Sequence, residues 1–139
     1  RLASNNGFPG GKVDIPIVLG GGFGAVSGVQ LDLMFDGLTF ANPVCTLHPG
    51  QAGRTFDTSF PSEPPAPFGY DVLRMIIHDE GGSTAVNDGP IATCRFDVLA
   101  DATPGTYPIV ADRVQVINAE ARPLPYTASA GTISIAALT

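Results

Sequence analysis

The sequence of 139 residues contains no tryptophan, two cysteines, two histidines and only seven lysine and arginine residues. These few cations are outnumbered by 13 carboxylates and form no basic cluster, which argues against nucleic acid or an anionic membrane surface as a partner. No apolar run approaches the roughly 20 residues that a transmembrane helix needs. We therefore expect no nucleic-acid binding and no membrane insertion.

The scarcity of histidine and cysteine also limits catalysis and metal binding. His48 and His78 lie in no recognisable nucleophile arrangement, and no GxSxG motif occurs. The glycine-rich run 20–24 lacks the Lys-Ser/Thr pair and the following helix of a phosphate-binding loop. The acidic stretch 79–88 lacks the alternating ligand spacing of a calcium loop, which favours a solvated loop. We expect a protein that is not an enzyme and has no catalytic residues, no metal site and no cofactor of its own.

The residues that are present favour an all-β fold. The sequence is 44% hydrophobic and carries 17 glycines and 13 prolines, a composition too punctuated for long helices and too apolar for disorder. The clearest strand is within residues 28–36, where apolar and polar side chains alternate. The inward set is Val29, Leu31, Leu33 and Phe35, and the outward set is Gln30, Asp32 and Met34. A period of two is typical of a strand with one buried and one wet face.

Further alternating or apolar segments predict about nine strands, the number typical of a β-sandwich. The other segments are 12–19, 38–41 continuing toward Cys45, 70–78, 90–99, 106–110, 113–117, 124–127 and 132–137. Residues 2–11 are interpreted as a polar lead-in, and 46–67 as a long irregular stretch. The proline run 61–67 favours a stiff surface loop over a ligand for aromatic grooves. We expect a single domain over residues 1–139, with its core at about 11–137.

Cys45 and Cys94 are the only cysteines. A disulfide between them would close a loop of roughly 50 residues and stabilise the fold by ~4 kcal/mol. Two isolated thiols lack the paired spacing of a zinc site, and two free buried thiols remain the alternative. The inward phase of its strand places Cys94 in the core with Phe96, where Cys45 could reach it across the two sheets.

The order and spacing of several motifs resemble a cohesin domain. These motifs are GKVDIPIVL with its glycine-rich turn, VSGVQLDLMFD with the following LTF, RMIIHDEGGS, GPIATCRFDVL and ADATPGTYPI, and they extend roughly from Gly11 to Ile135. The resemblance implies a nine-stranded jelly-roll sandwich without catalysis. It also implies a dockerin-like partner, a small helical module that would carry calcium itself. The expected setting is secreted or cell-surface, as in cellulosome scaffoldins that gather polysaccharide-degrading enzymes, and the domain alone is expected to be monomeric.

The resemblance also implies a binding face. Cohesins dock their partner on one sheet face, through strands that match residues 28–36, 72–78 with the following loop, and 91–98. The first strand's polar docking positions fall on Gly28 and Gln30, where cohesins often carry Asn and Asp, so this chain departs from the usual set. The complete expected partner-binding set is Gly28, Gln30, Asp32, Met34, Arg74, Ile76, His78, Asp79, Glu80, Thr93, Arg95 and Asp97.

Alternatives remain open for the binding face and for the function of the chain. Met34 and Ile76 are apolar at positions expected to be wet, which suits either an interface core or cover by a loop. A carbohydrate-binding module of similar fold is the alternative function, although a chain without tryptophan cannot easily build a flat aromatic platform. A purely structural surface domain is a third possibility.

Overall fold

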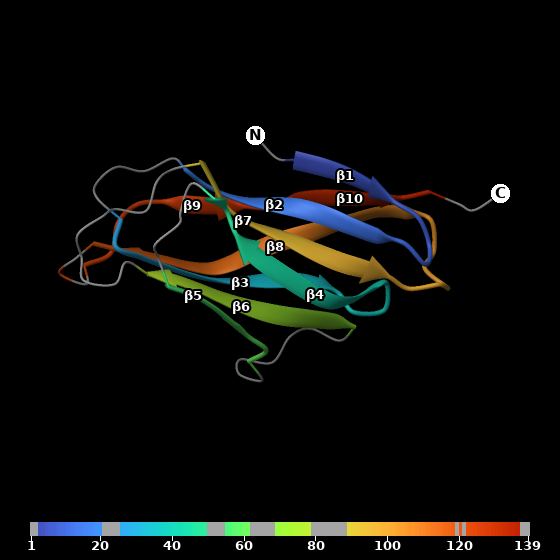
Figure 1. The fold of residues 1–139 in the computed structure, drawn as a ribbon, viewed down its shortest axis with the longest axis horizontal. Coiled ribbons are helices and arrows are strands. Elements are labelled where there is room, and N and C mark those ends of the chain that lie inside the picture. Colours follow the sequence, from blue (N-terminus) through green and yellow to red (C-terminus); the bar gives the residue numbers. More distant parts are fainter. Residues whose placement is uncertain are drawn as a thin grey trace.

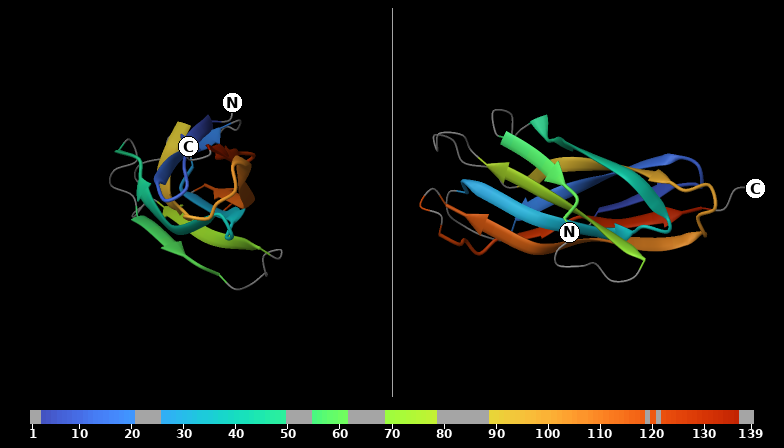
Figure 2. Two further views of the ribbon diagram at one scale, coloured as in Figure 1. Left: turned by 90° about the vertical axis from the view of Figure 1, so that its right-hand side faces the viewer. Right: turned by 90° about the horizontal axis from the view of Figure 1, so that it is seen from below.

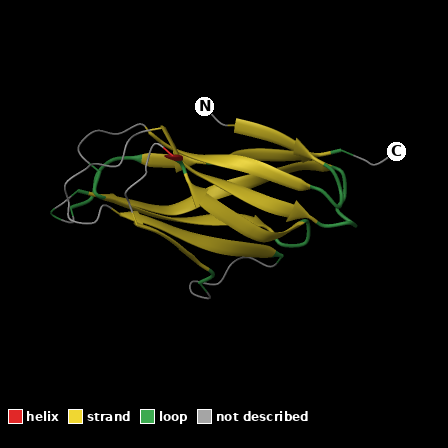
Figure 3. Ribbon diagram, viewed as in Figure 1, coloured by secondary structure: helices red, strands yellow, loops and turns green. Residues whose placement is uncertain are grey.

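The computed structural model describes residues 3–20, 26–49, 55–61, 69–78, 89–118, 120 and 122–136. Ten strands form most of this part of the chain (Figures 1 and 3). They are β1 (Ala3–Gly7), β2 (Lys12–Gly20), β3 (Gly28–Asp36), β4 (Phe40–Leu47), β5 (Thr55–Ser59), β6 (Tyr70–His78), β7 (Gly89–Val98), β8 (Gly105–Ile117), β9 (Thr127–Ser129) and β10 (Gly131–Ile135).

The strands form two sheets that curl around a common core, as the end-on view in Figure 2 shows. One sheet has six strands in the order β1-β10-β8-β3-β6-β5, and the other has four in the order β4-β7-β2-β9. Neighbouring strands are antiparallel except for β1 and β10, which pair in parallel. The predicted all-β sandwich with jelly-roll topology is confirmed, with ten strands rather than nine.

Three local differences account for the strand count. The expected polar lead-in forms β1, whose partner β10 lies at the other end of the sequence. The stretch predicted to be irregular contains β5, a short edge strand paired with β6. The two strands expected around residues 111–112 are one continuous strand, β8. A bulge interrupts its pairing with β3, and Arg113 adopts a φ of 49° there.

The core lies between the inward faces of the two sheets. Val29, Leu31, Leu33 and Phe35 of β3 are each at most 2% exposed, as their alternation predicts. Opposite them, Phe96 of β7 meets Phe35 edge to face, with ring centroids 5.0 Å apart. Complete burial of an aliphatic or phenyl side chain stabilises a fold by about 1.5–3 kcal/mol. The buried face of β3 therefore fixes which of its side chains point outward.

Cys45 and Cys94 form a disulfide within the four-stranded sheet. Cys45 of β4 lies directly opposite Cys94 of β7, with 4.0 Å between the Cα atoms. The expected link across the two sheets is therefore wrong, because β4 and β7 are neighbours in one sheet and bring the two residues into register. Cys94 is fully buried, as its phase predicts. No helix in the described ranges is long and apolar enough to cross a membrane.

Candidate docking face

The outward side chains of β6, β3 and β8 form one surface, which we call the β3 face. The odd-numbered residues of β3 and β6 point into the core, so their even-numbered residues lie on the outside, where they face each other in cross-strand pairs. These pairs are Gly28–His78, Gln30–Ile76, Asp32–Arg74 and Met34–Val72. On its other side β3 pairs with β8, which adds Val110, Asp112, Arg113, Gln115 and Ile117. Seven of the predicted binding residues thus share one surface.

The predicted residues of β7 do not belong to this surface. Thr93, Arg95 and Asp97 lie in the four-stranded sheet, where β7 is flanked by β4 and β2. The expectation that they share a face with the β3 and β6 residues is wrong. A period-two pattern shows which side of a strand is buried, but it does not show to which sheet the strand belongs. Asp79 and Glu80 follow His78 directly and lie outside the described residues.

The β7 residues form their own exposed ion pairs. Arg95 donates from Nε and Nη2 to the carboxylate of Asp14 at 2.7 and 3.1 Å. This hydrogen bond lowers the pKa of Asp14 and raises that of Arg95. Hydrogen bonds from Lys12 and Asn42 lower the pKa of Asp97. Exposed pairs of this kind contribute little to stability, because water screens the two charges.

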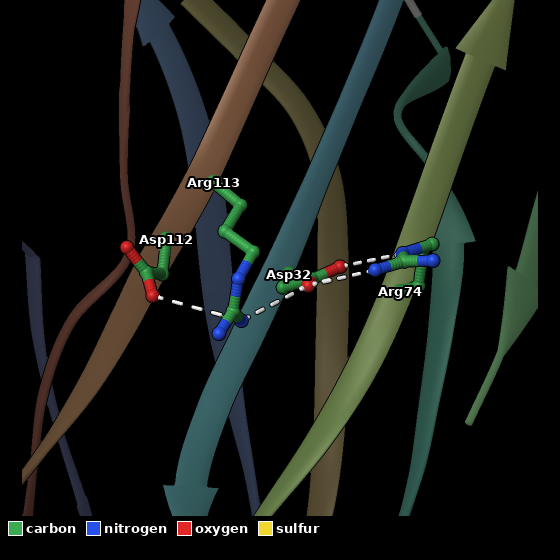
Figure 4. Close-up of polar contacts among 4 residues, drawn as sticks. All are labelled: Asp32, Arg74, Asp112 and Arg113. Carbon is green, nitrogen blue, oxygen red and sulfur yellow. Dashed lines mark hydrogen bonds and ion pairs between the residues drawn. The ribbon is translucent and has the colours of Figure 1, made fainter. Parts of the chain in front are cut away.

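An ionic cluster occupies the middle of the β3 face (Figure 4). Arg74 of β6 donates from Nε and Nη2 to the two carboxylate oxygens of Asp32, at 2.8 and 3.1 Å. Arg113 approaches Asp32 from the opposite side, with 3.3 Å between Nη1 and Oδ2. The same Nη1 lies 3.8 Å from Asp112. The hydrogen bond to Asp32 raises the pKa of Arg74. One carboxylate on β3 therefore binds two guanidinium groups, one from each of the strands that flank β3.

Asp32 is the largest departure from the sequence prediction on this face. It points outward as expected, yet only 1% of the residue is exposed, so it is not a wet docking residue. The bulge in β8 explains this burial: Arg113 and Val114 together stand opposite Leu31, and the extra residue brings Arg113 to the outer surface beside Asp32. The two arginines, whose side chains are 25% and 38% exposed, are the parts of this cluster that solvent reaches, together with Asp112.

Apolar groups flank the ionic cluster. Val110 and Ile117 of β8 are 40% and 37% exposed, while Met34 and Ile76 are half-buried. A hollow of about 150 Å³ lies beside Ile117, and its lining residues are Gly28, Val29, Gln30, Ile76, Ile77, His78, Gln115 and Ile117. The contribution of β8 was not predicted from the sequence. The sequence pattern divided β8 into two strands, and β8 lies far from its partner β3 along the chain.

A larger cleft of about 610 Å³ opens at the side of the sandwich, between the start of β4 and the start of β6. Phe60 and Tyr70, which are 65% and 39% exposed, contribute to its wall. Asn42 and Asp71 add polar groups. Neither this cleft nor the β3 face contains a metal-binding arrangement: within the described ranges, no three His, Cys, Asp or Glu side chains are grouped to hold an ion.

Comparison with known proteins identifies the fold. No protein-family model matches the sequence, and a search of curated proteins also finds no match. Solved cohesin structures match nearly the whole chain. A type I cohesin–dockerin complex from Clostridium thermocellum aligns with a TM-score of 0.79 at 15% identity, over 97% of this chain and 96% of the matched chain.

Two further structures extend the comparison. The solution structure of CaCohA2 from Clostridium acetobutylicum aligns with a TM-score of 0.74 at 18% identity, over 97% of this chain and 88% of that one. A non-cellulosomal cohesin from the archaeon Archaeoglobus fulgidus aligns with a TM-score of 0.59 at 12% identity, over 97% and 87%. The chain therefore has the fold of cohesin domains.

Proposed function

We propose that this chain is a non-catalytic protein-docking module that binds a dockerin-like domain through the β3 face. The observation that carries the proposal is the match of 97% of the chain to a chain from a solved type I cohesin–dockerin complex. A second complex, of CaCohA2 with a variant of CaDoc0917, aligns over the same share of the chain with a TM-score of 0.73.

The composition of the β3 face supports this role. Interface cores are enriched in apolar residues and arginine, and the charges near their centre are few and paired. Val110 and Ile117 supply exposed apolar area beside Arg74 and Arg113, and the Asp32 carboxylate compensates both cations. Asp79 and Glu80 remain proposed members of the site because they follow His78 on β6. Thr93, Arg95 and Asp97 are assigned to the opposite side and are not expected to contact the same partner.

The biological setting follows from the same proposal. The module would tether enzymes or surface proteins outside the cell, and calcium would belong to its partner. The disulfide between Cys45 and Cys94 supports an oxidising, extracytoplasmic location, where such bonds persist. The contacts to the partner differ from the usual cohesin set, because Gly28 and Gln30 replace the Asn and Asp often found at these positions.

Titration calorimetry tests this function. The wild-type module is titrated with the dockerin-like modules encoded by the same organism, in calcium and again with a chelator. We expect one or more modules to bind in calcium, and the heat to vanish with the chelator because the partner loses its fold. Absence of binding by every module in calcium would reject the proposal.

The side cleft favours carbohydrate binding as a second candidate function. Its volume of about 610 Å³ falls in the range of small-molecule sites, and exposed Phe60 and Tyr70 offer ring faces for stacking on a sugar. This candidate predicts retention of the module on insoluble polysaccharide, and loss of retention in Tyr70→Ala. Equal elution of wild type and variant in the void volume would exclude it.

A further inference from the structure

Gly28 lines the hollow on the β3 face, next to Ile117. Gly28 lies between Ile117 of β8 and His78 of β6. A Cβ added at Gly28 would lie 3.2 Å from Cγ1 and 3.3 Å from Cδ1 of Ile117, closer than an ordinary contact, so any side chain there would press on Ile117 and change the wall of the hollow. The φ of Gly28 lies outside the left-handed region, so its backbone does not require glycine.

The lining of the hollow favours an apolar occupant. The outward side chains of Ile76 and Ile117 provide apolar walls, and Gln30, Gln115 and His78 are the polar residues among the lining groups. Among the described residues that line it there is no lysine, arginine or carboxylate, and a charge buried without a partner is strongly disfavoured. An engineered cavity of about the same size, ~150 Å³, accommodates benzene. One branched aliphatic side chain therefore matches the hollow in both size and polarity.

Positive charge lies at a fixed distance from this hollow. Gly28 and Asp32 are four residues apart on β3, which corresponds to about 13 Å along the strand. The guanidinium of Arg113 lies over Asp32, and 38% of its side chain is exposed. Its Nη1 makes the contacts to Asp32 and Asp112, whereas a guanidinium carries five N–H donors. The cation can therefore bind a partner carboxylate while it stays paired with Asp32.

We propose that the Gly28 hollow is the socket for one branched aliphatic side chain of the docking partner, and that Arg113 receives a carboxylate from the same partner about 13 Å away. This inference rests on the proposed docking function and specifies the chemistry of the partner surface. The neutral hollow and the neighbouring cation are complementary to an aliphatic residue and an acidic residue at that spacing.

Reshaping the hollow tests the first contact. In Gly28→Val the new side chain presses on Ile117 and reshapes the socket, and a β-branched residue suits a strand. We expect affinity for the bound dockerin-like module to fall roughly tenfold or more, as at an interface hot spot, and Gly28→Ala to cause a smaller loss. The matched control is Gly20→Val on β2, where an added Cβ meets no atom within 4 Å. Thermal melts of each variant establish that the fold is intact.

Removing one charge tests the second contact. Arg113→Gln keeps a hydrogen-bond donor near Asp32 and loses the cation, so we expect weaker binding with a reduced dependence of affinity on salt. Wild-type affinity in Gly28→Val, or an unchanged salt dependence in Arg113→Gln, overturns the inference and leaves the docking function standing.

A small-molecule probe tests the socket without any partner. N-acetyl-leucinamide is titrated into the ¹⁵N-labelled wild-type protein, and backbone amide shifts are followed by NMR. We expect changes centred on Gly28, Gln30 and His78 that are absent in Gly28→Val and absent with N-acetyl-glutamine amide. Shifts that are scattered over the surface, or equal for both probes, contradict the socket even if no dockerin-like module binds. Failure of the inference can thus be distinguished from failure of the proposed function.

Discussion

Replacing Asp32 with asparagine should destabilise the protein more than any other single charge removal on the β3 face. Asp32 is 1% exposed and is contacted by Arg74 at 2.8 and 3.1 Å and by Arg113 at 3.3 Å. The asparagine amide would retain one carbonyl acceptor and turn an NH₂ donor toward guanidinium groups that are themselves donors only. Two cations would then lie close together without their shared counter-ion.

The size of the effect follows from the exposure of the two arginines. Removing one partner of a fully buried ion pair costs about 3–5 kcal/mol. Here the Arg74 and Arg113 side chains are 25% and 38% exposed, so water screens part of the lost interaction. We expect Asp32→Asn to lower the free energy of unfolding by about 2–3 kcal/mol. For a domain of this size, that corresponds to a fall in Tm of roughly 6–12 °C.

Urea and thermal denaturation, followed by circular dichroism, measure the change. The matched control is Asp112→Asn, which removes an exposed carboxylate 3.8 Å from the same Arg113 and should cost less than about 0.5 kcal/mol. If Asp32→Asn is as stable as wild type, or no less stable than Asp112→Asn, the buried ionic cluster does not exist as described. Asp32 would then be the wet docking residue that the alternation of β3 predicts.

Three further predictions concern the four-stranded sheet. The double variant Cys45→Ala/Cys94→Ala should lose about 4 kcal/mol, the value for a closed loop of roughly 50 residues; wild-type stability under matched denaturation would contradict the bond between β4 and β7. The hydrogen bond from Arg95 lowers the pKa of Asp14. This pair therefore stabilises the fold above about pH 4, the ordinary pKa of the carboxyl group. Its contribution disappears as the pH falls through the lowered pKa. Asp14→Asn should therefore flatten the acid side of the Tm–pH curve, and an unchanged curve would show that the pair contributes nothing. Arg95→Glu should leave affinity for the docking partner unchanged in calorimetry, and a clear loss would place the interface on β7.

The alternation of β3 predicted much of the fold because the burial of a strand face leaves a direct record in the sequence. The alternation from Val29 to Phe35 in β3, and the phase that placed Cys94 and Phe96 of β7 in the core, gave the inward side of these strands correctly. The pairing of strands leaves no such record. β7 alternates as regularly as β3, and nothing in its residues indicates that it joins β4 and β2 rather than β3 and β6.

The candidate site was predictable to the same extent. The outward residues of β3 and β6 followed from their phase, which brought Gln30 and Ile76 together. The burial of Asp32 did not follow, because it depends on a bulge in β8 that moves Arg113 to the outer surface. The β1 and β5 strands were not predicted because each is short and is a strand through its pairing with β10 or β6. The hollow was also not predicted, because its residues come from β3, β6 and β8, and the pairing of these strands cannot be read from the sequence.

Hydrogen–deuterium exchange of the module, alone and bound to a dockerin-like module, tests whether the β3 face is the docking surface. We expect slower exchange on binding along β3, β6 and β8, including the amides of Gln30, Ile76 and Gln115. We expect unchanged exchange at Thr93 and Arg95 of β7. Protection confined to β7, β2 and β4, with no change along β3, would contradict the assignment of the β3 face as the docking surface.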